Sequence, residues 1–261
     1  MTLFTDYHMH PQGHKHQPYT LELLQPWADS CRGKGITDFA VTDHDRYYPG
    51  IDFEAIARCR EKNPDLNIRA GIELDNDPVS SEAGRAWVDK HWDQLDFVLG
   101  SVHYLGGESQ MFDAADQAPQ FDRLGVEASY ENYLHQLQLL IGRGHIDCLA
   151  HLDLIKIHKY RLPNQNPADV FDPILRLIKQ HDLAMEISTA GWRKPVGEQY
   201  PDLAIAQRAI SLGIPFTIAS DAHSHVQVGE NYHRVAIIVQ ELGIKEVATF
   251  DKHQRTMKRL S

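Results

Sequence analysis

Short apolar runs rich in β-branched residues recur along the chain, and most are followed by a turn and a longer stretch with apolar residues at helical spacing. Seven runs have the length and composition of strands, at residues 3–8, 38–42, 68–72, 97–102, 148–152, 184–187 and 215–219. The helical stretches lie at residues 21–32, 52–62, 82–94, 129–142, 167–181, 202–211 and 245–259. This alternation predicts an α/β fold with a parallel sheet, either closed into a barrel or doubly wound.

Local signals support some of these boundaries and narrow the fold. Thr20 has the side chain of an N-cap, and Gly142, Gly144 and Gly213 follow predicted helices, as left-handed C-cap glycines do. No predicted strand is followed by GxGxxG or GxxxxGK[ST], so a nucleotide-binding doubly wound sheet lacks its usual signal. Residues 104–127 are long and irregular, which is typical of a lid or binding loop.

Polar residues with metal-binding side chains occur at the downstream end of every predicted strand. In chain order they are His8 and His10, Asp43, His44 and Asp45, Glu73 and Asp75, His103, His151 and Asp153, Glu186, and Asp221 and His223. The downstream ends of parallel strands meet at one rim, and in α/β barrels that rim is where the chemistry is built. The pattern therefore predicts that these side chains converge.

The residue types and their spacing point to bound metal ions. His8 and His10 are two apart on a strand, so both side chains lie on the same face, and Asp221 and His223 repeat this spacing. Imidazole suits zinc, manganese and iron, and carboxylates can bridge ions in a multinuclear site. One such pair is a weak signal, but two pairs with single ligands at the strand ends between them are a strong one.

The same residues resemble the pattern of the PHP (polymerase and histidinol phosphatase) superfamily. The matching motifs are HxH at 8–10, TDH at 42–44, Glu73, SVH at 101–103, AHLD at 150–153 and SDAH at 220–223. The resemblance spans residues 6 to about 229. It implies a distorted (β/α)7 barrel with the metal site at the C-terminal rim of its strands.

The resemblance also implies a ligand set of nine residues for two or three divalent ions of zinc, manganese or iron. The groups are His8, His10, Glu73 and Asp221 for one ion, Glu73, His103 and His151 for a second, and His44, His223 and His16 for a third. His16, six residues beyond His10, matches the family's loop spacing better than His14, which is the alternative. Glu73, Asp221 and His223 are the implied catalytic residues.

A more specific resemblance lies after the sixth predicted strand. Residues 186–201, EISTAGWRKPVGEQYP, are similar to a segment of histidinol-phosphate phosphatases, and residues 151–156 resemble their strand-five signature. This implies hydrolysis of L-histidinol phosphate to L-histidinol and phosphate in histidine biosynthesis. Ser188 stands where Asn is commoner, and residues 83–93 differ from the expected pattern, so the resemblance is more specific for the metal centre than for the substrate.

The expected reaction is in-line attack of a metal-bound hydroxide on phosphorus, because bound ions lower the pKa of water and neutralise phosphoryl oxygens. Arg193 and Lys194 follow the sixth strand and are the first candidates to bind phosphate, and Lys156 and Arg161 are weaker ones. The substrate amine and imidazole would prefer a carboxylate, and the candidates are Asp75, Asp153, Glu108 and Glu198. Asp45 and His225 are candidates for the general acid.

Composition and charge restrict the partners. The apolar fraction of 42% and charged fraction of 24% are ordinary for a globular protein, and we expect a single barrel domain over residues 1–261. With 26 basic and 36 acidic residues the net charge is −10, so a small phosphate monoester is expected rather than nucleic acid. No apolar stretch suggests a membrane span or a signal peptide.

Cysteines and the remaining histidines complete this picture. Cys31, Cys59 and Cys148 are widely spaced and fit a reducing, cytoplasmic setting better than a disulfide framework. Of the 16 histidines, seven outside the motifs are expected to be ordinary surface or core residues, namely His91, His135, His145, His158, His181, His233 and His253. A homo-oligomer is left open.

Three other interpretations compete with this one. Another PHP phosphoesterase could act on nucleotides or nucleic-acid ends, although the net charge argues against it. An amidohydrolase-type barrel also begins with HxH, but it generally needs a lysine on its fourth strand, and residues 97–103 contain none. A non-catalytic metal-binding PHP protein would be expected to have lost several ligands, whereas all nine positions are filled.

Overall fold

The predicted strands form one parallel sheet in a computed structural model that describes residues 4–260. Leu3, the first residue of the first predicted strand, lies outside the described residues. The seven strands follow one another in chain order across the sheet: β1 Thr5–Asp6, β2 Asp38–Val41, β3 Asn67–Leu74, β4 Phe97–Gly100, β5 Cys148–Leu149, β6 Ala184–Ser188 and β7 Phe216–Ala219. Each neighbouring pair is parallel, as the strand–helix alternation predicted.

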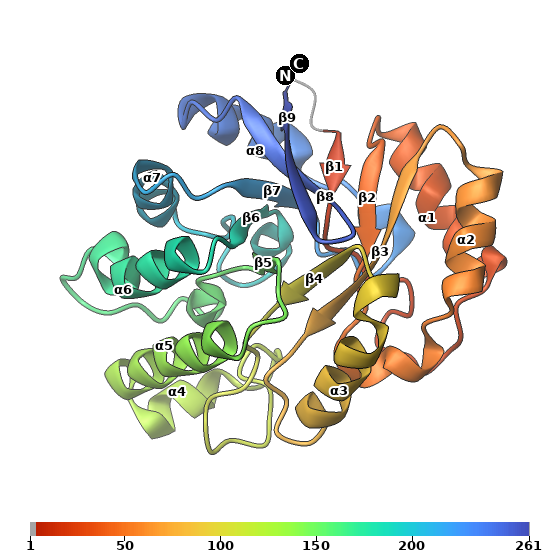
Figure 1. The fold of residues 1–261 in the computed structure, drawn as a ribbon. Helices are drawn as coiled ribbons and strands as arrows, with labels where there is room; N and C mark the ends of the chain where they lie inside the picture. Colours follow the sequence, from red (N-terminus) through yellow and green to blue (C-terminus); the bar gives the residue numbers. More distant parts are fainter. Residues whose placement is uncertain (1–3, 261) are drawn as a thin grey trace.

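Contacts between the first and last strands bend this sheet into a ring (Figure 1). The Tyr7 amide donates to the Ile218 carbonyl at 3.1 Å, and the His10 amide donates to the Ala222 carbonyl at 2.8 Å. Met9 and Ala222 form an isolated parallel bridge just beyond the strands. The predicted α/β class and distorted (β/α)7 barrel are confirmed, and the doubly wound alternative is excluded because β1 and β7 meet.

Helices surround the ring (Figure 1). They are α1 Leu21–Gly33, α2 Phe53–Lys62, α3 Ser81–His91, α4 Ala118–Leu124, α5 Val126–Arg143, α6 Pro167–Gln180, α7 Leu203–Ser211 and α8 Tyr232–Glu241. Thr20 caps α1 as predicted, its hydroxyl accepting a hydrogen bond from the Leu23 amide at 3.2 Å. Asp52, Asn166 and Asp202 cap α2, α6 and α7 in the same way, satisfying amides that have no partner inside the helix.

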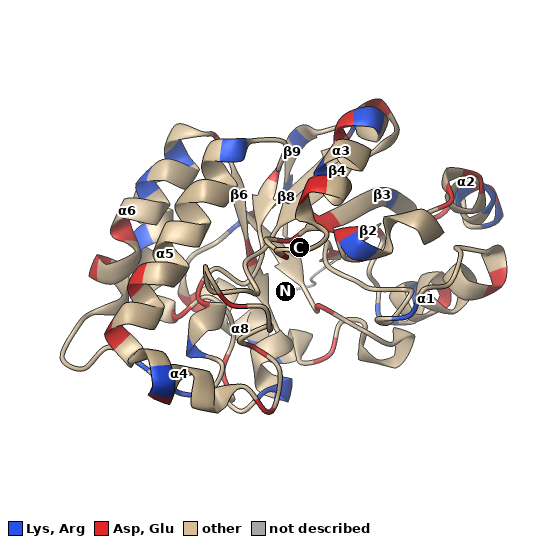
Figure 2. Ribbon diagram, turned by 90° about the horizontal axis from the view of Figure 1, so that it is seen from below, with Lys and Arg blue, Asp and Glu red and all other residues tan. Residues whose placement is uncertain are grey.

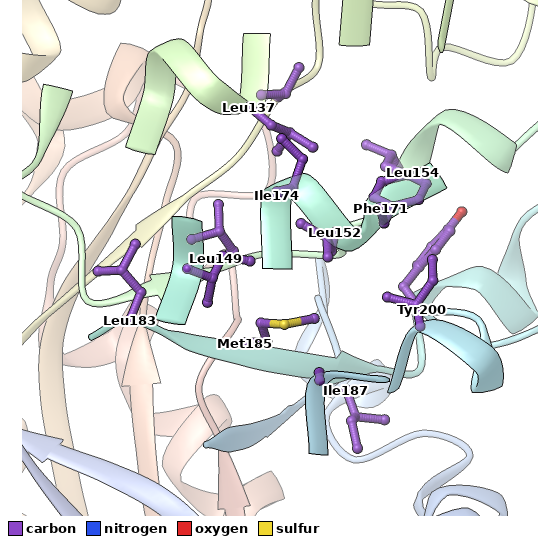
Figure 3. Close-up of a cluster of buried hydrophobic side chains, with 14 of the residues drawn as sticks. Leu137, Leu149, Leu152, Leu154, Phe171, Ile174, Leu183, Met185, Ile187 and Tyr200 are labelled. Carbon is purple, nitrogen blue, oxygen red and sulfur yellow. The ribbon is translucent and has the colours of Figure 1, made fainter. Parts of the chain in front are cut away.

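The main core fills the layer between strands and helices. Figure 3 shows part of it, with Leu137 of α5 and Ile174 of α6 lying near Leu149 and Met185 of the sheet. These side chains are buried, and the apolar faces of the amphipathic helices supply the helix side of the layer. Burial of this layer fixes the strands and therefore the rim that their downstream ends form.

A β-hairpin closes the end of the barrel opposite the C-terminal ends of the strands. Its residues belong to the segment 245–259, which was predicted to be a helix. The structure has β8 Glu246–Asp251 and β9 Gln254–Arg259 instead, joined by Lys252 and His253 at φ 48° and 62°. Two successive positive φ values are what a tight two-residue hairpin turn requires. Phe250 packs into the barrel interior against Tyr7 and Phe97, so tertiary burial overrides the helical spacing of this segment.

Other helix boundaries also differ from the predictions. Helices α4 and α8 were not predicted, and α4 lies within the segment expected to be irregular. Helix α5 extends to Arg143, so Gly142 lies inside it rather than after it, whereas Gly144 and Gly213 do follow helices at φ 73° and 69°. Within residues 4–260, every helix is too short or too polar to cross a membrane.

Candidate metal centre

Eight of the predicted ligands meet at the C-terminal ends of the strands. His8 and His10 follow β1, His44 follows β2, Glu73 lies near the end of β3, His103 and His151 follow β4 and β5, and Asp221 and His223 follow β7. Most of these side chains are buried, including His8 and Glu73 at 0% exposure. Acidic segments occur in the middle of the ring, whereas Lys and Arg lie mainly on the surrounding helices (Figure 2).

Strand geometry explains how the first pair of histidines reaches the centre. His8 and His10 point into the barrel mouth with ring centroids 4.9 Å apart, while Met9 between them turns away into an apolar cluster against helices α1 and α2. A parallel bridge between His44 and Glu73 brings the ends of β2 and β3 to the same level. The alternation of side chains along a strand is therefore sufficient to aim these ligands.

The Glu73 carboxylate lies between two groups of imidazoles. Its Oε2 atom is 2.8 Å from His44 Nδ1, 3.3 Å from His8 Nε2 and 3.6 Å from His10 Nε2. Its Oε1 atom is 3.6 Å from His151 Nε2 and 3.9 Å from His103 Nε2. A carboxylate with nitrogen ligands around each oxygen has the arrangement of a bridge between two ions.

Separations between the ligand atoms fit first-row divalent ions. Nitrogen and oxygen ligands at about 2.0–2.1 Å around a tetrahedral ion lie about 3.3 Å from one another. His10 Nε2 is 3.2 Å from Asp221 Oδ1, and His8 Nε2 is 3.7 Å from the same oxygen. His10, His44 and His223 form a further group whose nitrogens lie within 4.8 Å of one another.

Many polar atoms of this cluster are buried without a hydrogen-bond partner among the described residues. They are His8 Nε2, both ring nitrogens of His10, His44 Nδ1, both oxygens of Glu73, His151 Nδ1 and His223 Nε2. Buried polar groups are normally paired, because leaving one unpaired costs about 1–3 kcal/mol. The donor set is that of zinc, manganese or iron, so the residues present fit bound metal ions.

Electrostatics favours the protonation states that metal binding needs at His10 and Glu73. Burial lowers the pKa of His10 well below its ordinary value, and repulsion from His223 and His44 adds to this effect. Burial alone would raise the pKa of Glu73, but the charges of His44 and His8 hold it well below its ordinary value. Neutral imidazoles and an ionised carboxylate are the forms that bind a metal ion.

Outer carboxylates orient two of the histidines. Glu186 of β6 accepts from His8 Nδ1 at 3.0 Å, and its other oxygen accepts from the His151 amide at 2.7 Å. Asp75 lies 2.9 Å from His103 Nδ1 and is held in turn by Arg46 at 2.6 Å. The sequence offered Glu186 only as one of the rim residues and Asp75 as a substrate partner, because strand spacing does not reveal which carboxylate lies behind which ring.

The loop after β1 brings His14, not His16, to the cluster. The His14 ring stacks on His223 with centroids 4.2 Å apart and lies 5.4 Å from His44. The His16 ring packs against Tyr47 at 4.8 Å and does not line the cavity above the cluster. Gly13 and His14 both have positive φ, at 55° and 62°, and this turn sends His14 back over the rim.

A cavity of about 260 Å³ opens above the ligand cluster. Its histidine, acidic and basic lining residues are His14, His44, Glu73, His103, Asp113, His151, Arg193, Lys194, Asp221 and His223. Arg193 donates to the Ser220 and Asp221 carbonyls at 2.6 and 2.9 Å, while its Nη1 has no hydrogen-bond partner among the described residues. Arg193 and Lys194 thus line the cavity from the side of β6, as their sequence position suggested.

The two weaker candidates for phosphate binding lie elsewhere. Lys156 is buried and pairs with Asp153 at 2.8 Å, and Arg161 pairs with Glu198. Both line a separate cavity over α5 and α6. Their charges are committed to these ion pairs, and they do not line the cavity above the cluster.

Neither of the two candidates for the general acid lines the cavity above the ligand cluster. Asp45 is buried behind β3, where burial and the charge of Asp75 raise its pKa to about 8, and it accepts from the Asp75 amide at 3.3 Å. His225 lies at the outer edge near Ser30, 3.4 Å from its hydroxyl.

Comparisons with known proteins agree with the geometry. The model of the PHP domain matches residues 6–190. A protein of Deinococcus radiodurans named "Probable histidinol-phosphatase" is 28% identical over 95% of this chain and 96% of its own length. The histidinol-phosphatase of Bacillus subtilis is 23% identical over 84% of this chain and 96% of its own length.

A solved structure shares the fold across nearly the whole chain. It is the histidinol phosphate phosphatase of Lactococcus lactis in complex with zinc, L-histidinol and phosphate, which is 20% identical with a TM-score of 0.74. The match covers 98% of this chain and all (100%) of that one.

Proposed function

The chain belongs to the PHP domain family, and we propose that it is a metal-dependent phosphomonoesterase that hydrolyses L-histidinol phosphate to L-histidinol and phosphate. The observation that carries the proposal is the Glu73 carboxylate, buried at the mouth of the barrel with imidazole nitrogens facing both of its oxygens. Relatives named histidinol-phosphatase, matched over most of their lengths, support this substrate.

Divalent ions belong in this cluster, and we propose two or three of zinc, manganese or iron. His8, His10 and Asp221 would hold one ion and His103 and His151 a second, with Glu73 between them. His44, His223 and His14 form the third group. Bound ions would bring the pKa of a water molecule close to neutrality and offset the charge of the phosphoryl oxygens.

The chain's own residues would bind and orient the phosphoryl group. Arg193 has one guanidinium nitrogen fixed on the Ser220 and Asp221 carbonyls, while Nη1 makes no hydrogen bond among the described residues and lies 3.6 Å from Glu230 Oε2. Lys194 lines the same side. A guanidinium held in place by backbone contacts loses little freedom when it binds phosphate oxygens, so Arg193 is the better clamp of the two.

The outer carboxylates would keep the histidines in place during turnover. Glu186 fixes the ring of His8 and the backbone of His151, and Asp75 fixes the ring of His103. Such partners set the tautomer and orientation of a ligating ring. A cytoplasmic setting is part of the proposal, and it fits the three free cysteines, which are all buried.

A phosphate-release assay tests the proposal. We expect kcat/KM for L-histidinol phosphate to exceed that for p-nitrophenyl phosphate, a nucleoside monophosphate and a 3′-phosphorylated oligonucleotide by at least about 100-fold, the discrimination that polar groups built for one substrate can reach. Metal content is measured on the same sample. Preference for the nucleotide or the oligonucleotide would replace this proposal by the rival PHP activity, and no release from any ester by the metal-loaded protein would exclude catalysis.

A further inference from the structure

The substrate in the proposed function carries a cation that the cavity must accommodate, and this inference rests on that function. The ammonium group of L-histidinol phosphate lies on the carbon next to the one bearing the ester oxygen. Amines of this kind are protonated at neutral pH, whereas an imidazole with an ordinary pKa near about 6.5 is mostly neutral. Outside the metal-ligand cluster, the basic residues Arg193 and Lys194 line the cavity and would repel the ammonium. The ammonium therefore needs a carboxylate partner.

The four carboxylates suggested by the sequence are already engaged in ion pairs. Asp75 holds His103 and Arg46, and Asp153 pairs with Lys156. Glu198 contacts Arg161 and Lys156, and Glu108 pairs with Arg123 at 2.7 Å on an exposed loop. None of these four lines the cavity above the metal-ligand cluster. The substrate cation would have to displace a cation of the protein from each of them.

Asp113 differs from these carboxylates in each respect. It lines the same cavity as Glu73 and His103, and no ion pair of Asp113 occurs within residues 4–260. Its Oδ1 atom is buried and has no hydrogen-bond partner in that part of the chain. A carboxylate oxygen that is shielded from water and unpaired is a ready acceptor for a charged donor.

The backbone around Asp113 is anchored to the metal-ligand side of the barrel. The Phe112 amide donates to the His103 carbonyl at 2.9 Å, and His158 Nε2 donates to the Phe112 carbonyl at 2.9 Å. The Phe112 ring is fully buried and meets Phe121 and Tyr133 edge to face. Because its neighbour is fixed in the core, Asp113 is held over the cavity rather than carried on a loose loop.

Asp113 is also close to the site of reaction. It lines the same cavity as His103, and the amide of its neighbour Phe112 donates to the His103 carbonyl. His103 faces Glu73 Oε1 at 3.9 Å. The ammonium nitrogen is separated from the ester oxygen by only two carbons, so a partner near the metal ligands is required and a partner on the outer surface would be out of reach.

We propose that Asp113 accepts the ammonium group of the substrate and thereby selects phosphate monoesters that carry a cation two carbons from the ester oxygen. Phosphate would lie between the metal-ligand cluster and Arg193, with the ammonium directed to the loop that follows β4. Asp113 is thus a specificity residue for binding, and its role is separate from that of the metal ligands.

The test compares Asp113→Asn with the unchanged protein on three substrates. They are L-histidinol phosphate, its des-amino analogue imidazolylpropyl phosphate, and p-nitrophenyl phosphate. Loss of one charge-assisted hydrogen bond should lower kcat/KM for L-histidinol phosphate by about 10- to 100-fold, mainly through KM. The two esters without the amine should change by less than about twofold, because they make no such bond. Metal content should be unchanged.

Asp116→Asn is the matched control, since Asp116 is an exposed carboxylate of the same loop whose only side-chain hydrogen bond within residues 4–260 comes from Gln117 Nε2 at 3.3 Å. It should behave like the unchanged protein on all three esters. Equal losses on all three esters in Asp113→Asn, or no loss on any, would overturn the proposal while leaving the histidinol-phosphatase function intact. Failure of the unchanged protein to prefer L-histidinol phosphate would instead overturn the proposed function, and this inference with it.

Discussion

Buried polar groups are hydrogen-bonded at one end of the barrel, whereas many of those at the other end are unpaired. At the end closed by the β8–β9 hairpin, aspartates at the start of strands are paired: Asp38 accepts from the Tyr7 hydroxyl at 2.6 Å and from Lys258 at 2.9 Å. Asp147 accepts from the Val98 amide and from His253. At the C-terminal rim, both oxygens of Glu73, both ring nitrogens of His10 and one ring nitrogen each of His8, His44, His151 and His223 are buried without hydrogen-bond partners among the described residues.

This contrast separates residues that hold the fold from residues that hold a ligand. Paired polar groups and the buried Phe250 ring stabilise the hairpin end without any further component. Unpaired groups at the rim cost stability, and that cost is offset only when ions bind. Substitutions at the rim should therefore change activity and metal content, whereas substitutions at the hairpin end should change stability alone.

Glu73→Gln tests the functional role of the rim, and we expect it to have the largest effect. Replacing the Glu73 carboxylate by an amide removes a negative charge facing five imidazole rings. We expect kcat/KM to fall by at least about 10³-fold, equivalent to about 4 kcal/mol of transition-state stabilisation, and metal content to fall with it. Phosphate release and elemental analysis on one sample measure both.

Glu54→Gln is its control, because the Glu54 side chain is 89% exposed on α2. It should leave both quantities unchanged. Full activity in Glu73→Gln would rule out the bridging role, whereas loss of activity with full metal content would make Glu73 a residue of the reaction rather than a ligand.

Phe250→Ala tests the opposite end. The ring lies 4.9 Å from Phe97 and 5.9 Å from Tyr7 inside the barrel, so truncation leaves a cavity and should lower the free energy of unfolding by about 3–5 kcal/mol. Denaturant unfolding measures this loss, and kcat and metal content at 25 °C should stay near those of the unchanged protein. Met257→Ala, at a side chain 40% exposed on β9, should cost far less. A loss of metal from folded Phe250→Ala would show that the two ends are coupled.

Glu186→Gln tests whether the carboxylate that holds the ligating histidines also contributes to metal binding. Glu186 holds the His8 ring and the His151 backbone but lies outside the proposed ligand set. Loss of such a partner typically lowers metal affinity or activity by about 10- to 100-fold. Competition with a chromophoric chelator measures the affinity, and Glu246→Gln, at an exposed position on β8, is the control. An unchanged affinity would limit the functional region to the ligands themselves.

Local rules explain why so much of the rim could be predicted. Alternation in the extended segment that follows β1 places His8 and His10 on one face, and the parallel sheet brings the ends of β3 and β7 to the same level. Both facts depend only on residue spacing and strand direction. For this reason eight of the nine predicted ligands converge without any knowledge of side-chain contacts.

Features that depend on turns or on distant partners could not be predicted in this way. His14 and His16 are separated by one residue, and only the positive φ of Gly13 and His14 decides which ring faces the cluster. Lys156 and Glu198 are neutralised by partners, one close and one far along the chain, that no spacing rule identifies. The hairpin turn lacks the Asn-Gly signature, so the helical spacing of 245–259 was misleading.

The smallest expected effect concerns a histidine that resembles the rim histidines in type but not in surroundings. His253 lies in the hairpin turn, stacked on Trp92 at 3.6 Å, with Nδ1 2.8 Å from Asp147 and Nε2 3.0 Å from the Trp92 carbonyl. Burial would lower its pKa, but the hydrogen bond and charge of Asp147 raise it above the ordinary 6.5. His253 therefore adds stability while it is protonated.

The sign of the pH dependence follows from that raised pKa. The stabilisation is fully present below the pKa of the unfolded chain, 6.5, and is lost as the pH rises through the higher pKa of the folded protein. His253→Asn tolerates the positive φ of 62° and cannot titrate, so it should be less stable by about 1 kcal/mol near pH 6, and the difference should shrink towards pH 9. Urea unfolding of both proteins across this range measures the difference, in which contributions of the distant rim cancel. A difference that grows with pH would mean that His253 is held neutral. Its pKa would then be lowered, as burial lowers the pKa of His10 at the rim.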